Sequence, residues 1–193
     1  MKLQRILPVI FAVVLMLLLM TACSNNQNVT VISGEALRIC GSWAYIHDKD
    51  TAIAVFHEDG SAQYEGKDYS FACDSQFIKL TDTDGETIQL RYTLDDEGMY
   101  LYRSTTYTFS GVGEPDGLVG EWTCADKNWS YSFTEAGTFQ EDGYFPGKYT
   151  VDDESSTFKL VYIDQFEDTL CYFRLAENQL YIEYPWPMVR KHQ

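Results

Sequence analysis

Cys23 is the residue whose surroundings indicate chemistry most clearly. Two basic residues precede a nearly unbroken apolar run from Ile6 to Met20, and Ala22 stands directly before the cysteine. A charged start, an apolar stretch and small residues before a cut are typical of a targeting segment. The last residues before the cysteine look like a lipobox. We therefore expect cleavage at this point and acylation of the Cys23 thiol.

The apolar run is also informative through its length. It is shorter than the roughly 20 residues that a membrane-spanning helix needs. We predict a lipoprotein signal peptide over residues 1–22, with the mature chain held outside the cytoplasm at a bacterial membrane through Cys23. An uncleaved anchor with a chance cysteine is the alternative. Polar residues follow, so residues 23–40 are expected to form a flexible tether that ends in a short helical turn.

Catalytic and metal-binding patterns are weak along the chain. The histidines His47, His57 and His192 have no nucleophile elbow, zinc-binding helix motif or paired-cysteine motif beside them. The acidic turn from Asp82 to Glu86 lacks the third ligand position and the distal glutamate of an EF-hand. We therefore predict no enzyme activity, no cofactor and no metal. A carboxylate-dependent hydrolase remains an alternative, because the many acidic residues could supply a catalytic pair.

Four cysteines remain after Cys23, namely Cys40, Cys73, Cys124 and Cys171. An even number outside the cytoplasm permits two disulfides. Free buried cysteines that act as small hydrophobic residues explain the pattern equally well, because Cys124 and Cys171 align with apparent core positions. Both alternatives stay open.

The charge of the chain restricts its partners. It has 14 basic and 29 acidic side chains, a formal net charge of −15, which signal removal lowers to −17 because two basic residues are lost. Nucleic acid and anionic lipid head groups are poor partners for such a protein. An unknown protein, a glycan or a small molecule remains as the ligand.

An internal repeat organises the mature chain. Gly41-Ser42-Trp43 opens one unit and Gly120-Glu121-Trp122 opens another, and each is followed by Phe-x-Glu-x-Gly. Six such landmarks recur in the same order, 77 to 81 residues apart, which argues against chance. We predict duplicated units over residues 41–110 and 120–193. A linker with several Gly residues and a Pro joins them over 111–119.

Within each unit, apolar and polar residues alternate, as at Trp129, Tyr131 and Phe133. This period of two is typical of half-buried strands, and turn residues separate the strands. About six strands per unit, joined by short turns, predict an all-β fold. The expected topology is an antiparallel up-and-down meander that forms two small barrels or strongly curled sheets.

The short helical turn before each Gly-x-Trp resembles the lipocalin pattern. The duplicated form is similar to lipocalin-like domains of bacterial surface lipoproteins whose function is uncharacterised. The resemblance implies a structural role for the signature residues Gly41, Trp43, Gly120 and Trp122. It also implies an arginine from the last strand near the tryptophan, and Arg103 and Arg190 are the candidates.

The strand count bears on function. Eight strands leave an interior just wide enough for side chains or one small ligand, so units of about six strands should be filled by their own residues. A ligand would then bind outside the cores, where Tyr100, Tyr102, Tyr107, Tyr181 and Trp186 are expected. We predict a non-catalytic binding or interaction module. A lipocalin-like carrier of a small hydrophobic ligand is the alternative, and the carboxylate-dependent hydrolase is the second.

Overall fold

The computed structural model describes residues 34–96, 98–163 and 166–191. The predicted signal peptide, Cys23 and most of the tether therefore lie outside the described residues, as does His192. Within the described ranges, no helix has the length and apolar character needed to span a membrane.

The described secondary structure consists of one short helix and fourteen strands. These elements are α2 (Gly34–Ile39), β1 (Gly41–Tyr45), β2 (Ala54–Phe56), β3 (Ser61–Tyr64), β4 (Lys67–Cys73), β5 (Phe77–Thr81), β6 (Thr87–Leu94), β7 (Met99–Phe109), β8 (Gly120–Cys124), β9 (Trp129–Phe133), β10 (Thr138–Glu141), β11 (Phe145–Asp152), β12 (Thr157–Tyr162), β13 (Thr169–Ala176) and β14 (Gln179–Arg190). The predicted all-β antiparallel meander is thus confirmed. A helical turn forms where it was expected before Trp43, but residues 116–119 form a turn closed by a single bridge instead.

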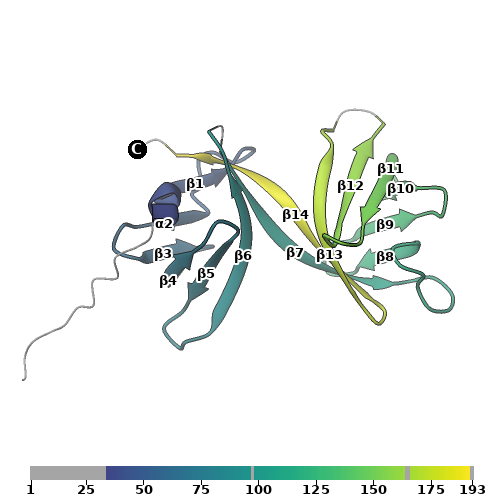
Figure 1. Ribbon diagram of the computed structural model, residues 1–193, viewed down its shortest axis with the longest axis horizontal. Coiled ribbons are helices and arrows are strands. Elements are labelled where there is room, and N and C mark those ends of the chain that lie inside the picture. The colour runs from purple at the N-terminus through teal and green to yellow at the C-terminus, as the bar shows by residue number, and fades with distance from the viewer. Residues whose placement is uncertain (1–33, 97, 164–165, 192–193) are drawn as a thin grey trace, which may run out of the picture. The chain divides into compact units, whose positions relative to one another are not determined.

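Successive strands pair antiparallel, and β1 pairs with β14 to close the series into a ring (Figure 1). Strands β7 and β14 also pair with each other, from Met99 opposite Met188 to Thr108 opposite Gln179. This pairing divides the ring in two. The first ring contains β1 to β6, and the second contains β8 to β13; each is completed by one half of β7 and one half of β14.

The prediction of about six strands per unit therefore needs correction. Each ring has six strands of its own and shares two more, so eight strands surround each interior. The shared strands have 11 and 12 residues. At about 3.3 Å per residue, each is long enough to reach both rings. Turn residues indicate where strands end, but they do not indicate that one strand belongs to two rings.

Two proline residues mark the place where β14 changes neighbours. Pro185 and Pro187 lie between the segment that pairs with β13 and the segment that pairs with β1. The Pro187 carbonyl accepts a hydrogen bond from the Ile46 backbone N–H at 3.1 Å, on the side away from β7. Its ring nitrogen faces that same side, so pairing with β7 does not require the missing donor.

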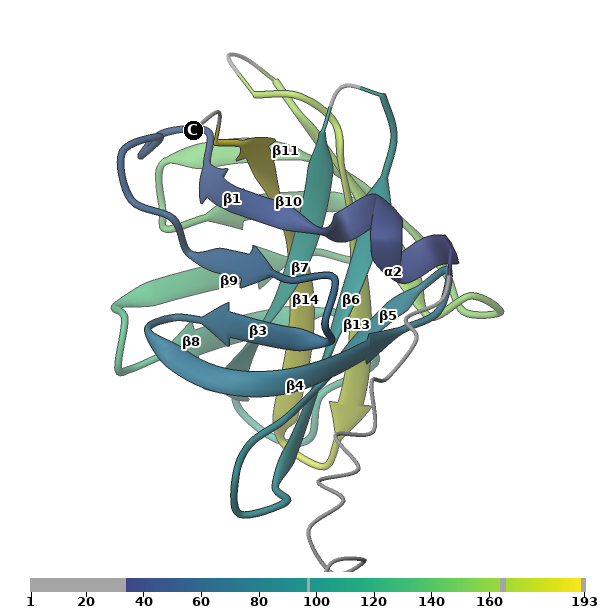
Figure 2. The same cartoon turned by 90° about the vertical axis from the view of Figure 1, so that its left-hand side faces the viewer.

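Two hydrophobic cores fill the rings, and the shared strands contribute to both. Strand β7 places Leu101 in the first core and Tyr107 in the second. Strand β14 places Ile182 in the second core and Met188 in the first. Helix α2 lies against the first ring, where its Ile39 is fully buried (Figure 2). Each predicted unit therefore ends in a strand that also belongs to the other core.

The two Gly-x-Trp segments have matching environments. Trp43 and Trp122 are 1% and 0% exposed, so the two tryptophans are buried to the same extent. The indole N–H of Trp43 donates to the Ile39 carbonyl, and that of Trp122 donates to the Leu118 carbonyl, both at 2.8 Å. Equivalent residues thus satisfy the one polar group of each buried indole with the segment immediately before the strand.

The residue that covers each tryptophan comes from a shared strand. The Arg190 guanidinium of β14 lies 4.6 Å from the Trp43 ring, whereas Phe109 of β7 meets Trp122 edge-on at 5.2 Å between ring centroids. Arg190 therefore occupies the place that the lipocalin resemblance implies for an arginine. Arg103 instead pairs with Glu65 at 2.7 Å.

Candidate functional site

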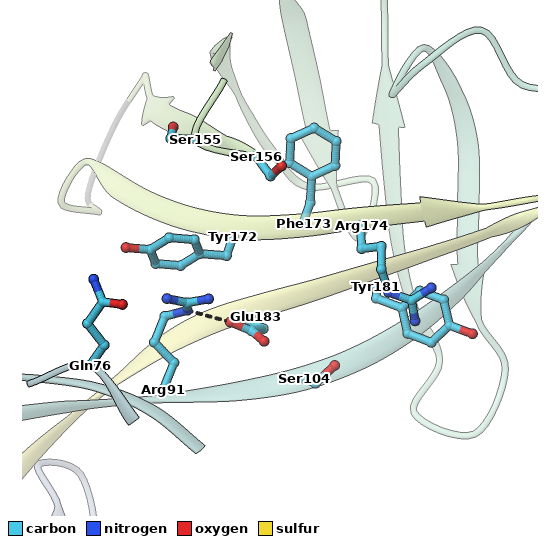
Figure 3. A pocket seen from close by; sticks show the side chains of 10 residues that line it. All are labelled: Gln76, Arg91, Ser104, Ser155, Ser156, Tyr172, Phe173, Arg174, Tyr181 and Glu183. Carbon is cyan, nitrogen blue, oxygen red and sulfur yellow. Dashed lines mark hydrogen bonds and ion pairs between the residues drawn. The ribbon is translucent and has the colours of Figure 1, made fainter. Parts of the chain in front are cut away.

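An open groove of about 690 Å³ runs along the outer faces of β6, β7, β13 and β14 (Figure 3). Strand alternation explains which side chains reach it. Leu180 and Ile182 are buried in the second core, so Tyr181 and Glu183 point to the opposite face of β14. The groove therefore lies outside both cores, and its walls come from both rings.

Arg91 of β6 is held on three sides. Its Nε donates to Glu183 Oε2 at 2.8 Å, and its guanidinium lies 3.8 Å from the Tyr172 ring centroid (Figure 3). The guanidinium also lies 4.5 Å from the ring centroid of Phe77. The Arg91 side chain is only 20% exposed. Phe77 belongs to the first ring and Tyr172 to the second, so this stacked cation joins the two rings.

Only the Nε atom of the Arg91 guanidinium donates a hydrogen bond to another described residue. Within the described ranges, its Nη1 and Nη2 atoms have no hydrogen-bond partner, and both sit at the groove (Figure 3). A guanidinium presents its N–H groups in a planar fork that matches two oxygen atoms of an anion. The fixed Arg91 thus offers preorganised donors to whatever occupies the groove.

A second arginine lies farther along the groove. The Arg174 guanidinium of β13 stacks 3.8 Å from the ring centroid of Tyr181 on β14. No acidic residue in the described part of the chain forms an ion pair with it. Arg174 is therefore an exposed cation, held in place by an aromatic ring, in a chain whose formal net charge is −15.

The rim of the groove consists of two loops, and in each an aspartate accepts hydrogen bonds from backbone amides of the same loop. On one side, Asp74 accepts hydrogen bonds from the Gln76 and Phe77 amides, both at 2.8 Å. On the other side, Asp152 accepts from the Ser155 hydroxyl at 2.8 Å and from two backbone amides. These bonds stabilise the carboxylate form and lower the pKa of both aspartates. The loops place Gln76 and two serines at the groove.

The aromatic residues predicted outside the cores have different positions. Tyr181 lies in the groove, Tyr100 is exposed, and Tyr102 is buried but belongs to neither core; Tyr107 is buried in the second core, which corrects the prediction for that residue. Tyr107 belongs to the second core because β7 crosses into that ring. Trp186 is half-buried, with its ring 5.6 Å from that of Tyr45.

Other predicted reactive groups do not meet in the groove. His47 and His57 are exposed and lie outside its lining, and the described residues contain no group of three or more potential metal ligands. The four described cysteines are free thiols. Burial raises the pKa of Cys171, as it does for the partly buried Cys40 and Cys73.

One carboxylate lies within the second ring. Glu141 accepts hydrogen bonds from the hydroxyl groups of Tyr131 at 2.8 Å and Tyr162 at 2.5 Å. Burial raises the pKa of Glu141, although these two hydrogen bonds oppose the shift. Both carboxylate oxygens are occupied by tyrosines, so this residue acts as part of the packing around the second core.

The eight-stranded rings also change the argument about an internal ligand. Eight strands can enclose a small ligand, so strand number alone does not exclude one. Large side chains occupy the interiors instead, among them Trp43 and Phe56 in the first core and Phe133 and Phe158 in the second. Ile88 lies on the same face of β6 as the core residue Tyr92 but is 40% exposed.

Sequence reasoning did not single out Arg91, Arg174 or Glu183. Each occupies the polar position of an alternating strand, where a solvated charge is the ordinary expectation. Their meeting depends on the pairing of β7 with β14, which brings β6 and β13 to one groove. No local sequence signal indicates this arrangement.

Comparison of the chain with protein-family models, with curated proteins and with solved structures finds no match.

Proposed function

We propose that this chain is a lipid-anchored bacterial lipoprotein that acts outside the cytoplasm as a non-catalytic binding module. The anchor would be Cys23, for the sequence reasons given above. The groove carries the binding part of the proposal. It combines an open volume of about 690 Å³ with two stacked arginines and hydroxyl-bearing loops, and pockets of a few hundred cubic ångströms suit small ligands.

The same chemistry disfavours the carboxylate-dependent hydrolase. A carboxylate mechanism needs two acids about 5 to 10 Å apart across the substrate. Among the described residues that line the groove, Glu183 is the only acid, and it is paired with Arg91. Binding is therefore the activity that this groove supports best.

We further propose that the two rings arose by duplication and that each is a lipocalin-like barrel. Matching backbone bonds support this history. The Phe71 amide donates to the Gly60 carbonyl, and the Tyr149 amide donates to the Gly137 carbonyl, both at 2.9 Å. The two glycines follow the same Phe-x-Glu motif and have φ values of 85° and 73°. In this proposal, the duplicated units share β7 and β14 across a pseudo-twofold axis.

The anchor can be tested by expressing wild-type and Cys23→Ser protein in a bacterial host supplied with a labelled fatty acid. The wild-type protein should be shortened by the signal peptide and carry the label. The variant should accumulate as unlabelled precursor. Normal cleavage and labelling of the variant would refute the lipoprotein proposal.

The binding role can be tested by filling the groove. Ser104 is exposed on β7 at the groove, so Ser104→Trp should obstruct it. Thr123→Trp, at an exposed position of β8 outside the lining, is the matched control. Against a defined panel of oligosaccharides and peptides, we expect binding that the first variant loses and the second retains. Binding that neither substitution affects would place the site elsewhere.

A further inference from the structure

We propose that the groove binds an acidic oligosaccharide, with Arg174 and the terminal nitrogens of Arg91 binding the sugar carboxylates. This inference rests on the proposed binding function and specifies its ligand class. It depends on the charges, the hydrogen-bonding groups and the strand topology around the groove.

The charge in the groove is opposite to that of the chain. Two guanidinium groups and one carboxylate line it, which leaves one net positive charge where the whole chain carries −15. Glu183 engages only the Nε of Arg91. Distant acidic groups are screened beyond about 10 Å at ordinary ionic strength. Asp74 and Asp152 in the rim loops add nearby negative charge, but their carboxylates accept hydrogen bonds within their own loops. Arg91 and Arg174 are the cations that line the groove itself and face an anion bound there.

The arginines are suited to a planar oxyanion. Stacking on Tyr172 and Tyr181 fixes the plane of each guanidinium and leaves its edge available for hydrogen bonds. A bidentate arginine–carboxylate contact is shorter and stronger than a hydrogen bond between neutral groups. Because both rings stack before a ligand arrives, binding requires less ordering of these long side chains.

The remaining groups favour a hydroxylated ligand over an apolar anion. Ser104, Ser156 and Gln76 provide hydroxyl and amide groups around the arginines, while the Ser155 hydroxyl donates to Asp152 within its own loop. Such groups can both donate to and accept from sugar hydroxyls. A fatty acid would instead need an apolar channel, whereas large side chains occupy both ring interiors.

The strand topology favours a glycan over an acidic peptide. Extended peptides commonly bind by adding a strand to an open sheet edge. In the described part of the chain, successive strands pair around a closed ring, and β7 and β14 beneath the groove pair with each other. A ligand in this groove must therefore be recognised by side chains, as a sugar acid would be.

Calorimetric titration of the full chain, purified in detergent, tests the inference. The probes are a trisaccharide of galacturonic acid, the neutral trisaccharide of galactose, and triglutamate. We expect the acidic trisaccharide to bind more tightly than either other probe. Arg174→Gln should weaken its binding at least about tenfold, which corresponds to about 1.4 kcal/mol. Lys67→Gln makes the same charge change at an exposed position of β4 and should have little effect.

A second variant tests whether binding needs the planar pair of N–H donors of Arg91. Arg91→Lys keeps the positive charge but loses the planar pair of donors, so it should weaken acidic-trisaccharide binding while leaving a cooperative thermal transition. If Arg91→Lys does not fold, Arg174→Gln, on an exposed side chain, still decides the question. Raising the salt concentration should also weaken binding by the wild-type protein.

The outcomes separate this inference from the proposed function. Equal binding of acidic and neutral trisaccharides, unchanged in Arg174→Gln, overturns the carboxylate site but leaves a binding groove. Tighter binding of triglutamate identifies an acidic peptide as the ligand and overturns the glycan assignment. No binding of the acidic trisaccharide at millimolar concentration also overturns the inference. Failure of the proposed function would appear separately, as ligand binding that Ser104→Trp does not change.

Discussion

Glu141 is a partly buried acid whose ionisation affects the stability of the fold. Burial raises its pKa in the folded protein, so the folded state binds a proton more readily than the unfolded state. Its ionisation therefore destabilises the fold as pH rises through the raised pKa. The tyrosine hydrogen bonds reduce this cost without removing it.

Replacing this acid with an amide should remove its contribution to the pH dependence of stability. Glu141→Gln cannot ionise, so its stability relative to wild type should be higher at pH 7 than at pH 4. Urea unfolding of both proteins at the two pH values measures this difference, and the contributions of all other acids cancel. A difference that is constant, or larger at pH 4, would contradict the raised pKa.

The two buried tryptophans should make similar contributions to stability. Trp43→Ala and Trp122→Ala should each lower the free energy of unfolding by about 3 to 5 kcal/mol, because each leaves a large cavity and removes an indole hydrogen bond. Trp186→Ala, at a half-buried position, should cost clearly less. Denaturant unfolding of the three variants measures the costs. A small effect at either Gly-x-Trp position would argue against equivalent cores.

At the scale of elements, the glycine of each Gly-x-Trp strand leaves room for a side chain of a shared strand. Gly120 has a φ of 132°, and a Cβ added there would lie 2.4 Å from the Phe109 ring. At Gly41, with a φ of 127°, the added Cβ would lie 2.9 Å from Arg190 Nη1. The glycines therefore allow β7 and β14 to place their last side chains over the tryptophans.

This arrangement predicts a difference between two glycine substitutions. Gly120→Ala should be more destabilising than Gly66→Ala, by about 1 to 3 kcal/mol, the usual cost of overpacking. Both positions have a positive φ, but nothing lies within 4 Å of a Cβ added at Gly66. Thermal unfolding of the two variants provides the comparison. Equal costs would show that backbone conformation alone selects the glycine at position 120.

At the scale of the whole molecule, the two cores depend on each other through β7 and β14. The first core lacks Met188 unless β14 returns to it after the second ring. Residues 34–110, produced alone, should therefore not fold cooperatively, whereas residues 34–193 should. Circular dichroism and amide proton dispersion distinguish the two results. An independently folded fragment would show that the shared strand is dispensable for the first ring.

The occupied interiors lead to a second prediction at this scale. A fluorescent fatty acid should bind the folded protein weakly or not at all, because aromatic side chains already fill the rings. Fluorescence titration measures the affinity. Tight one-to-one binding that is lost in Leu90→Asp, at a core-packed position outside the groove lining, with the fold retained, would instead establish the carrier alternative.

The sequence by itself determined the strands, the turns and the two tryptophan segments. Alternating polarity, turn residues and the Gly-x-Trp repeat are local signals, because each depends on neighbours a few residues away. They predicted the antiparallel meander and a matching Gly-x-Trp segment at the start of each unit. They also led to the prediction of filled interiors, through a strand count that was too low.

Only the tertiary structure decided how the strands are shared and where the groove lies. The pairing of β7 with β14 joins residues about 80 positions apart, such as Arg103 and Tyr184, and no periodicity within either strand specifies its partner. That pairing creates two rings of eight strands, buries Tyr107, and brings Arg91 to Tyr172 and Glu183. A surface arginine and a site arginine look alike in sequence because their difference lies in long-range contacts.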